Sequence, residues 1–384
     1  MTDGIQLDLR KLRIAGASYT LPFFAIFPLG HWNEDMTNDA SHRLKSVAEL
    51  SGETSIIEVP VRLPRAADLI LGPGLSEDPN FRCPSTTNLI RKYRMSDVVV
   101  GGAFRMLMKD NFVIRESLFG IPSEEIANAP EPDVLPFPFA KSKIGILGFL
   151  WTGSNYYHWL TQVLTSIDCC LSNKNHTNVF IVFPELDTIQ EKTLRILGYD
   201  EIERLVLSKN QQLCIPQLEF SDFFRDSLTL TRIMPSIFRR LKQGVRLKSP
   251  KNSRIYISRR DASFRFVTNE SDVIKILEQY GFVVVCPGQL ELEEQISCFH
   301  DASVVIGPHG QGLTHTVYCN EGTIVYELMP ENYKNVSIER LAINGGLRYF
   351  SDLSTQEIGT DNPQVVDLTI DTDILKHRLS EFGL

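Results

Sequence analysis

The sequence predicts an α/β protein in which two Rossmann-like units follow a β-rich N-terminal segment. From Lys143 onward, short apolar segments alternate with segments of helical periodicity, a succession typical of parallel sheets covered by helices. A polar stretch at residues 248–253 interrupts this alternation, which resumes after it. At 384 residues the chain also exceeds the usual size of a single hydrophobic core. We therefore expect two domains, with their boundary at this stretch.

The N-terminal segment, residues 1–140, carries strand signals more than helix signals. Residues 55–61 alternate in polarity, and residues 98–108 and 111–117 flank a polar turn like the two strands of a hairpin. Four prolines between Pro130 and Pro138 predict a loop into the next unit. We expect this segment to be β-rich and attached to the first domain.

The rest of the chain divides into three parts. Residues 141–248 form the first Rossmann-like domain, with alternating strands and helices expected at 144–150, 156–171, 179–183, 188–197, 204–207, 211–220 and 232–245. Residues 249–362 form the second, with alternating elements expected at 254–258, 270–280, 282–286, 291–300, 303–306, 313–319 and 323–328. Right-handed crossovers between its four strands predict a Rossmann-like half-domain. Residues 363–384 end in a helix expected at 373–382.

Composition narrows the class of protein. A formal net charge of −8 argues against a nucleic-acid binder, which needs a basic footprint. The seven cysteines show no C-x-x-C pair, and several lie in apolar runs, so we expect reduced thiols in a cytosolic protein. Charged residues between Asp3 and Arg13 leave no apolar core for a signal peptide or a membrane anchor.

Basic side chains follow the first strand of the second domain. Ligands of open parallel sheets bind beyond the carboxyl ends of the strands. Guanidinium groups there suit phosphate oxygens, and the following helix N-terminus adds donors. The alternative is that these arginines only solvate a loop. The candidate residues are Arg259, Arg260, Arg265, Asn269 and Glu270.

A glycine-rich turn follows the apolar run at 303–306. Strand, tight loop and helix in this order present free backbone N–H groups to an anion, although the pattern is neither G-x-G-x-x-G nor a P-loop. The candidate residues of this phosphate cradle are Gly307, His309, Gly310, Gly312, Leu313 and Thr314. His309 has the alternative of a satisfied loop histidine.

Glu327 ends the next expected strand and is a further candidate. A carboxylate at that place can accept hydrogen bonds from ribose hydroxyls. Its alternative is an ion pair with one of the arginines at the same sheet edge. Convergence of these groups on one edge favours a nucleotide diphosphate site.

His158 is the catalytic candidate of the first domain. It lies in the first turn of the helix expected at 156–171, on the side away from the apolar stripe. The helix dipole there disfavours imidazolium, so the neutral ring can accept a proton. The alternative is that His158, between Tyr157 and Trp159, is packed structure.

Taken in order, these motifs resemble the family 61 glycosyltransferases, including bacterial members associated with surface-polysaccharide synthesis. The resemblance spans about residues 153–330. It rests on Asn155 to Leu160 (NYYHWL), Tyr256 to Arg260 (YISRR), Arg265 followed by Asn269 and Glu270, Glu294 to Ile296, Gly307 to Thr314 (GPHGQGLT), and Glu327.

The resemblance implies a GT-B-like fold, two Rossmann-like domains that face a cleft, with a nucleotide-sugar donor held mainly by the C-terminal domain. It also implies inversion at the anomeric carbon with no essential metal and no cofactor. The family pattern carries onto Arg259, Arg265, Asn269, Glu270, His309, Gly310, Gly312 and Glu327 as donor-site residues, and onto His158 as the base.

Two departures from the family pattern bear on the site. Gln311 and His315 stand where the family commonly has Ala and Asn. Gln162 stands where many bacterial members have Glu. If that carboxylate were the family's base, this chain would lack it, which favours His158.

These observations predict an inverting, metal-independent hexosyl- or pentosyltransferase. It would move a sugar from a nucleotide-diphosphate sugar to a glycan or lipid-linked acceptor in surface-polysaccharide synthesis. We expect a cytoplasmic protein at or near the inner face of the membrane, with peripheral membrane association. The alternatives are a non-catalytic nucleotide-sugar-binding protein, which Gln162 favours, and a polysaccharide pyruvyl-type transferase.

Overall fold

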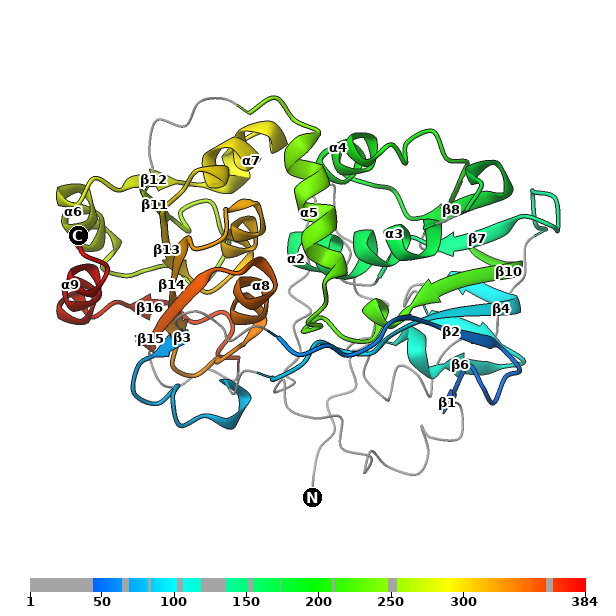
Figure 1. The fold of residues 1–384 in the computed structure, drawn as a ribbon, viewed down its shortest axis with the longest axis horizontal. Coiled ribbons are helices and arrows are strands. Elements are labelled where there is room, and N and C mark those ends of the chain that lie inside the picture. Colours follow the sequence, from blue (N-terminus) through cyan, green and yellow to red (C-terminus); the bar gives the residue numbers. More distant parts are fainter. Residues whose placement is uncertain are drawn as a thin grey trace, which may run out of the picture.

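The computed structural model shows two lobes side by side, each built around a β-sheet, with helix α5 (Ile233–Gln243) between them (Figure 1). The expected boundary at 248–253 and the prolines Pro130 and Pro132 lie outside the described residues. The structure describes residues 44–63, 69–81, 84–101, 106–118, 136–150, 155–172, 174–208, 211–247, 254–356 and 362–384.

The first lobe contains a nine-stranded mixed sheet in the described residues. Its order is β1-β6-β5-β4-β10-β7-β8-β9, and β2 also pairs with β4. The strands are β1 (Leu44–Lys45), β2 (Glu53–Glu58), β4 (Ile90–Gly101), β5 (Met106–Lys109), β6 (Phe112–Ile114), β7 (Ile144–Leu147), β8 (Val179–Phe183), β9 (Arg204–Val206) and β10 (Gln212–Ser221). β7 to β9 are parallel, and β10 joins them to the antiparallel N-terminal strands.

The predicted hairpin is present, although its first strand differs from the prediction. β5 and β6 are antiparallel across Asp110 and Asn111, whose φ angles of 50° and 64° are those of a tight hairpin turn. The strand expected at 98–108 is two antiparallel strands, because β4 ends at Gly101 and β5 begins at Met106.

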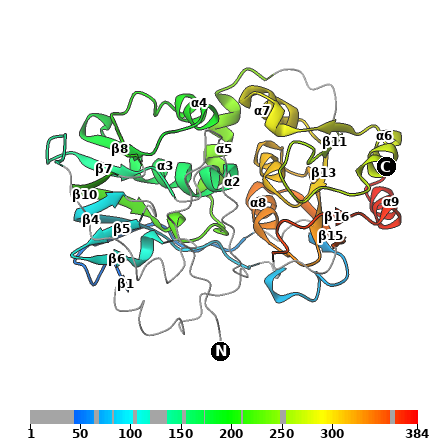
Figure 2. The same cartoon turned by 180° about the vertical axis from the view of Figure 1, so that it is seen from behind.

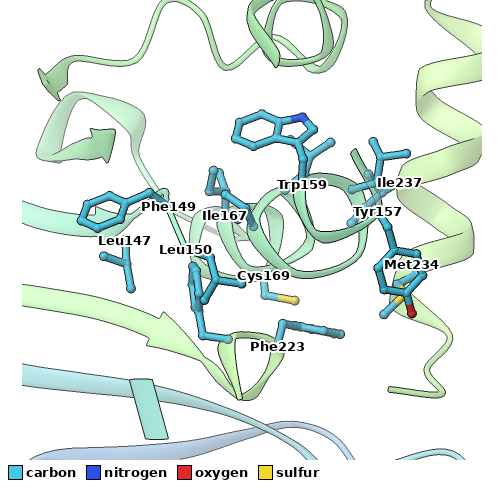
Figure 3. Close-up of a cluster of buried hydrophobic side chains, with 14 of the residues drawn as sticks. Leu147, Phe149, Leu150, Tyr157, Trp159, Ile167, Cys169, Phe223, Met234 and Ile237 are labelled. Atoms are coloured by element: carbon cyan, nitrogen blue, oxygen red, sulfur yellow. The ribbon is translucent and has the colours of Figure 1, made fainter. Parts of the chain in front are cut away.

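Helices cover this sheet at the predicted places. The helix expected at 156–171 consists of α2 (Tyr156–His158), a π-helical segment, η5 (Trp159–Leu164), and α3 (Thr165–Leu171). Figure 3 shows Trp159 and Ile167 of this helix among buried apolar side chains of the sheet and of α5. The next helix, α4 (Thr188–Leu197), begins with a capping box formed by Asp187 and Gln190.

The second lobe contains a seven-stranded, mostly parallel sheet in the described residues. Its order is β12-β11-β13-β14-β15-β16, and β3 also pairs with β15. The strands are β3 (Leu69–Leu71), β11 (Arg254–Ile257), β12 (Val283–Val285), β13 (Val304–Pro308), β14 (Ile324–Pro330), β15 (Arg348–Gln356) and β16 (Leu368–Thr369). The order reverses between β11 and β13, which marks a topological switch point where ligands of such sheets bind.

Helices lie on both faces of this sheet, as the alternation predicts (Figure 2). Tyr256, Ile306 and Tyr326 point to the face covered by α6 (Glu270–Gln279) and α9 (Thr372–Glu381). Val305 and Val325 point to the opposite face, which carries α7 (Leu292–His300), η9 (Gln311–Tyr318) and α8 (Ser337–Gly345). Neighbouring strand residues alternate between faces, so one strand contributes to both cores.

The predicted layout needs three corrections in detail. The segment 1–140 was expected to attach to the first domain, yet β3 extends the second sheet by pairing in parallel with β15. The helix expected at 313–319 is the 3-10 helix η9, which begins at Gln311. α8 and β15 were not predicted. The α/β class itself is confirmed.

Candidate functional site

The candidate donor site lies at the switch point of the second sheet, where β11 and β13 run side by side and in parallel. Glycines allow the two following loops to approach each other. A Cβ added at Gly307 or Gly312 would lie 3.0 or 2.7 Å from side-chain atoms of Ile257 on β11. Gly310 has φ of 153°, and a Cβ there would lie 2.1 Å from Arg259 Nη1. Close packing against β11 and Arg259 therefore explains why these three positions of the predicted phosphate cradle are glycines.

Arg259 joins the two loops. Its Nε and Nη2 donate to the carbonyls of Arg265 and Phe264 at 3.0 and 2.9 Å, and its Nη1 lies 3.5 Å from the carbonyl of His309. Burial, and then the charge of Arg265, lower the pKa of Arg259 to about 10. The structure thus gives Arg259 a role in holding the loops together.

Arg265 carries an unsatisfied buried charge. The residue is only 7% exposed, and its Nε and Nη1 are buried with no hydrogen-bond partner among the described residues. Its guanidinium lies 5.8 Å from the ring centre of Phe264 and 5.4 Å from that of Tyr333. Burial lowers its pKa. Buried polar groups are nearly always paired, so this guanidinium is prepared for an acceptor that the described residues do not supply.

The backbone of Arg265 supports the same interpretation. Its φ of 60° is in the left-handed region, where a long side chain is uncommon. Such conformations cost about 1–3 kcal/mol and cluster at functional sites. The loop therefore directs this side chain inward at the expense of local backbone strain.

His309 is held by a buried carboxylate. Its Nδ1 lies 2.5 Å from Glu327 Oε1, and the second oxygen of Glu327 accepts from the hydroxyl of Tyr349. The ring of Tyr333 packs edge-on against His309 at 5.5 Å. Burial lowers the pKa of His309, while the charge of Glu327 opposes that shift. Among the described residues, His309 Nε2 has no hydrogen-bond partner.

The predicted ribose contact of Glu327 is not supported. Its side chain is 0% exposed, and both oxygens already accept hydrogen bonds from His309 and Tyr349. The paired alternative that the sequence left open is nearer to the structure, although the partner is a histidine and not an arginine. Glu327 therefore acts on the site through His309.

Three further candidates, Arg260, Asn269 and Glu270, bond to other parts of the second lobe. Asn269 Nδ2 donates to the carbonyl of Ile370 and its Oδ1 accepts from the N–H of Ile370, which docks the segment before α9. Glu270 accepts from Tyr256 at 3.2 Å and from Arg260 Nε at 2.8 Å. The structure therefore shows Asn269 and Glu270 bonded within the protein's own framework, with Arg260 held by Glu270.

The last two cradle candidates lie in η9 and differ from each other. Leu313 is fully buried and packs in the core between the sheet and its helices. The hydroxyl of Thr314 is buried and has no partner among the described residues. Thr314 therefore remains a candidate donor, whereas Leu313 positions the loop by packing.

The catalytic candidate His158 has a defined tautomer. Gln162 Nε2 donates to the carbonyl of Phe223 at 2.8 Å, so Gln162 Oε1 is an acceptor, and it lies 2.5 Å from His158 Nδ1. The proton of the neutral ring therefore sits on Nδ1, and Nε2 carries the lone pair. Burial lowers the pKa of His158 to about 4, which keeps the ring neutral at pH 7.

An aromatic contact connects the two candidate regions. Tyr156, two residues before His158, stacks on His315 at 4.8 Å, and its hydroxyl lies 2.5 Å from that of Tyr318. His315 Nδ1 in turn lies 2.9 Å from the carbonyl of Gly312. The helix that carries His158 thus packs directly on the segment that follows the glycine loop, residues 307–312.

Sequence reasoning missed Tyr333 and Tyr349, which contact the site from later parts of the chain. A signal existed for the burial of Glu327, because it lies inside the apolar run from Ile324 to Met329, where a charge must be paired. Nothing in the sequence pointed to Tyr333.

Two further properties of the described residues concern metal binding and membrane insertion. No group of three or more His, Cys, Asp or Glu side chains is arranged to hold a metal ion in the part of the chain that the structure describes. Within the same ranges, none of the helices combines the length and the apolar character needed to cross a membrane.

Comparison with known proteins gives a family match that includes His158, Arg265 and His309. Residues 156–326 match the family described as Glycosyltransferase 61. A Gallus gallus protein named EGF domain-specific O-linked N-acetylglucosamine transferase is 24% identical in an alignment 199 residues long that covers 45% of this chain and 37% of that protein. An Arabidopsis thaliana protein named Beta-1,2-xylosyltransferase is 35% identical over 60 residues, 16% of this chain and 11% of that protein.

These matches confirm the predicted resemblance, and the enzyme class that they support is a glycosyltransferase. The aligned part of the chain spans 37% of the Gallus gallus relative and 11% of the Arabidopsis thaliana relative. Both named relatives come from eukaryotes, so they do not test the expected bacterial type.

Proposed function

We propose that this protein is an inverting, metal-independent glycosyltransferase that takes its sugar from a nucleotide-diphosphate donor. The observation that carries the proposal is the buried guanidinium of Arg265, close to His309 at the switch point of a parallel sheet, whose Nε and Nη1 have no hydrogen-bond partner among the described residues. A diphosphate supplies the acceptors that this guanidinium needs, and backbone N–H groups of the glycine loop add donors. Positive charge from Arg265 would stabilise the leaving diphosphate without a metal.

His158 is the proposed base. As the acceptor oxygen attacks the anomeric carbon, its hydroxyl proton passes to His158 Nε2, and the bond from that carbon to the donor phosphate breaks with its electron pair on the phosphate oxygen. Gln162 supports this role because it fixes the Nδ1 proton and leaves Nε2 as the acceptor. The neutral state of the ring at pH 7 supports it as well.

The proposal extends to fold and substrates. We assign a GT-B-like arrangement, with the donor on the second lobe and the acceptor on the first, because the two candidate regions meet at Tyr156 and His315. The relatives' names include an N-acetylglucosamine and a xylose transferase, which suits a hexosyl or pentosyl group. The proposed acceptor is a glycan or a lipid-linked sugar of surface-polysaccharide synthesis.

We also propose a cytoplasmic location with peripheral membrane association, where lipid-linked acceptors are reached. The free thiols of the six described cysteines support the reducing compartment.

The first test is nucleotide-sugar binding. We expect at least one of a panel of uridine, guanosine, adenosine and cytidine nucleotide sugars to raise the melting temperature. Arg265→Met should weaken that binding at least tenfold, because the diphosphate then loses its buried cation. Arg195→Met, which removes a 73% exposed charge on α4, is the matched control and should bind like the parent. Stabilisation by no member of the panel would overturn the donor site.

Turnover then separates the enzyme from the non-catalytic binding protein. With a donor that binds, His158→Ala should reduce transfer or donor hydrolysis by at least a hundredfold while leaving donor affinity within threefold. Binding without any turnover in the parent would favour the non-catalytic alternative. Unchanged turnover in the variant would remove His158 from the mechanism.

A further inference from the structure

We infer that His309 takes up a proton when the donor diphosphate binds and returns it to the diphosphate as the sugar leaves. This inference rests on the proposed function, because it requires a nucleotide-diphosphate ligand at the Arg265 site. It adds a second catalytic residue, an acid on the donor side, to the base proposed on the acceptor side.

The geometry of His309 matches that of a carboxylate-oriented histidine. Glu327 has one oxygen on the Nδ1–H of His309 and the other on the Tyr349 hydroxyl, so it is an acceptor on both sides and cannot turn away. The proton of the neutral ring therefore stays on Nδ1. Nε2, which has no partner among the described residues, is the atom that a ligand meets.

Charged and titratable groups from five parts of the second lobe surround His309 and its carboxylate partner. The loop after β11 contributes the positive Arg259 and Arg265, and β14 contributes the negative Glu327. Tyr333, in the loop after β14, packs edge-on against the ring. Behind the carboxylate lie the Tyr349 hydroxyl on β15 and Glu339 on α8, both within electrostatic range of Glu327.

Donor binding changes this balance. In the unliganded protein, burial and the two arginines hold His309 neutral against the pull of Glu327. A bound diphosphate brings two negative charges next to those arginines, which removes their effect on the ring and adds an attraction for a proton at Nε2. Binding then draws one proton from solvent to His309 Nε2. Because Nδ1 stays bonded to Glu327, the new proton on Nε2 faces the ligand.

The proton balance of transfer closes with these residues alone. The acceptor hydroxyl gives its proton to His158 Nε2 as its oxygen bonds to the anomeric carbon. The bond from that carbon to the phosphate oxygen breaks, and its electron pair takes the proton from His309 Nε2. His309 returns to the neutral state in which binding found it, and His158 releases its proton to solvent.

Calorimetry can test the uptake directly. UDP-glucose and GDP-mannose are suitable probes, together with any nucleotide sugar that stabilises the protein, because their diphosphates do not titrate near neutral pH. Binding heats measured at pH 7.5 in buffers of different ionisation enthalpy give the number of protons taken up. We expect at least half a proton per donor in the parent, and an affinity that rises about threefold or more between pH 8 and pH 7.

The variant His309→Asn keeps a donor group for Glu327 and so is designed to fold, but it cannot take up a proton. It should bind without proton uptake, with an affinity independent of pH. His377→Gln, at a 72% exposed histidine on α9, is the matched control and should retain the parental uptake.

The outcomes separate the two proposals. Binding without proton uptake in the parent, or uptake that persists in His309→Asn, overturns the role of His309 and leaves the glycosyltransferase proposal standing. Absence of binding by every nucleotide sugar overturns both.

Discussion

At His158 one hydrogen bond decides which ring nitrogen can accept a proton. The sequence suggested that Gln162 marks a missing carboxylate. In the structure its amide bridges His158 Nδ1 and the carbonyl of Phe223, an arrangement that a carboxylate could not make, because it has no N–H to donate. Gln162 is therefore a positioning residue that favours the neutral base.

Gln162→Glu should change the pH dependence of transfer. The wild-type base is active when unprotonated, so the acidic limb of kcat/KM should rise through the lowered pKa of about 4, whereas the proton uptake inferred for His309 acts on the alkaline side. A carboxylate at Nδ1 stabilises imidazolium, so the acidic limb should move by at least one pH unit toward neutrality. A pH profile of kcat/KM in both proteins measures the shift.

Gln162→Met serves as the control, since it removes the acceptor without adding charge, and it should lower kcat with no upward shift of the limb. An acidic limb that stays in place in Gln162→Glu would show that His158 is not the titrating base.

The same scale shows what the sequence could reveal about the site. Arg265 and His309 could be found because both follow buried strands, and strand ends of a parallel sheet meet at one edge. The role of Glu327 could not be settled, because a ribose contact and a buried pair require the same residue at the same place. That Arg265 Nε and Nη1 find no hydrogen-bond partner among the described residues depends on the surrounding fold and has no local signal.

At the scale of elements, the short distance between the glycine loop and neighbouring side chains determines where glycine is required. Gly310 needs both a positive φ and the absence of a Cβ, because Arg259 lies against it. Gly198, at the end of α4, has φ of 74° but no atom within 4 Å of an added Cβ. The two glycines therefore differ in steric contact and also in backbone conformation, since Gly310 (φ 153°, ψ −177°) lies outside the left-handed helical region that Gly198 (φ 74°, ψ 29°) adopts.

Gly310→Ala should accordingly cost more than Gly198→Ala. The second substitution carries only the backbone penalty of about 1–2 kcal/mol. The first also displaces the Arg259 guanidinium and with it the bonds that hold the loop containing Arg265. We expect a larger loss of unfolding free energy in urea and a loss of donor affinity in Gly310→Ala alone. Equal costs, with donor binding retained, would contradict the proposed loop contact.

Element types that depend on hydrogen-bond detail were harder to predict than element positions. The helix at 156–171 was predicted from its periodicity, but its π-helical segment was not. Inside it, Thr161 and Thr165 donate to the carbonyls of Tyr157 and Leu160, which competes with regular α-helical bonding. π-helical segments often occur at functional sites, and this one directly follows His158.

At the scale of the whole molecule, the two lobes share one core. Buried residues of α5, η9 and α8 belong to the same apolar cluster as the helix that carries His158. The predicted division into two units of alternating strands and helices was informative about the order of neighbouring elements, since the connections between them are short. The pairing of β3 with β15 could not be predicted, because its partners, such as Leu69 and Tyr349, are far apart in sequence.

The hydroxyl pair of Tyr156 and Tyr318 allows the contact between lobes to be measured. Tyr318 is fully buried, so Tyr156→Phe leaves its hydroxyl without a partner and should cost about 1–3 kcal/mol of unfolding free energy. Tyr318→Phe should also destabilise, while the double variant should cost little more than one single change, because no orphaned hydroxyl remains. Urea unfolding of the four proteins gives the coupling.

Combining Tyr318→Phe with Tyr280→Phe, at the end of α6 on the opposite face of the second sheet, should give additive costs. Additive costs for Tyr156 and Tyr318 themselves would mean that the lobes do not meet through this pair in solution, and the route from the His158 helix to the glycine loop would then have to lie elsewhere.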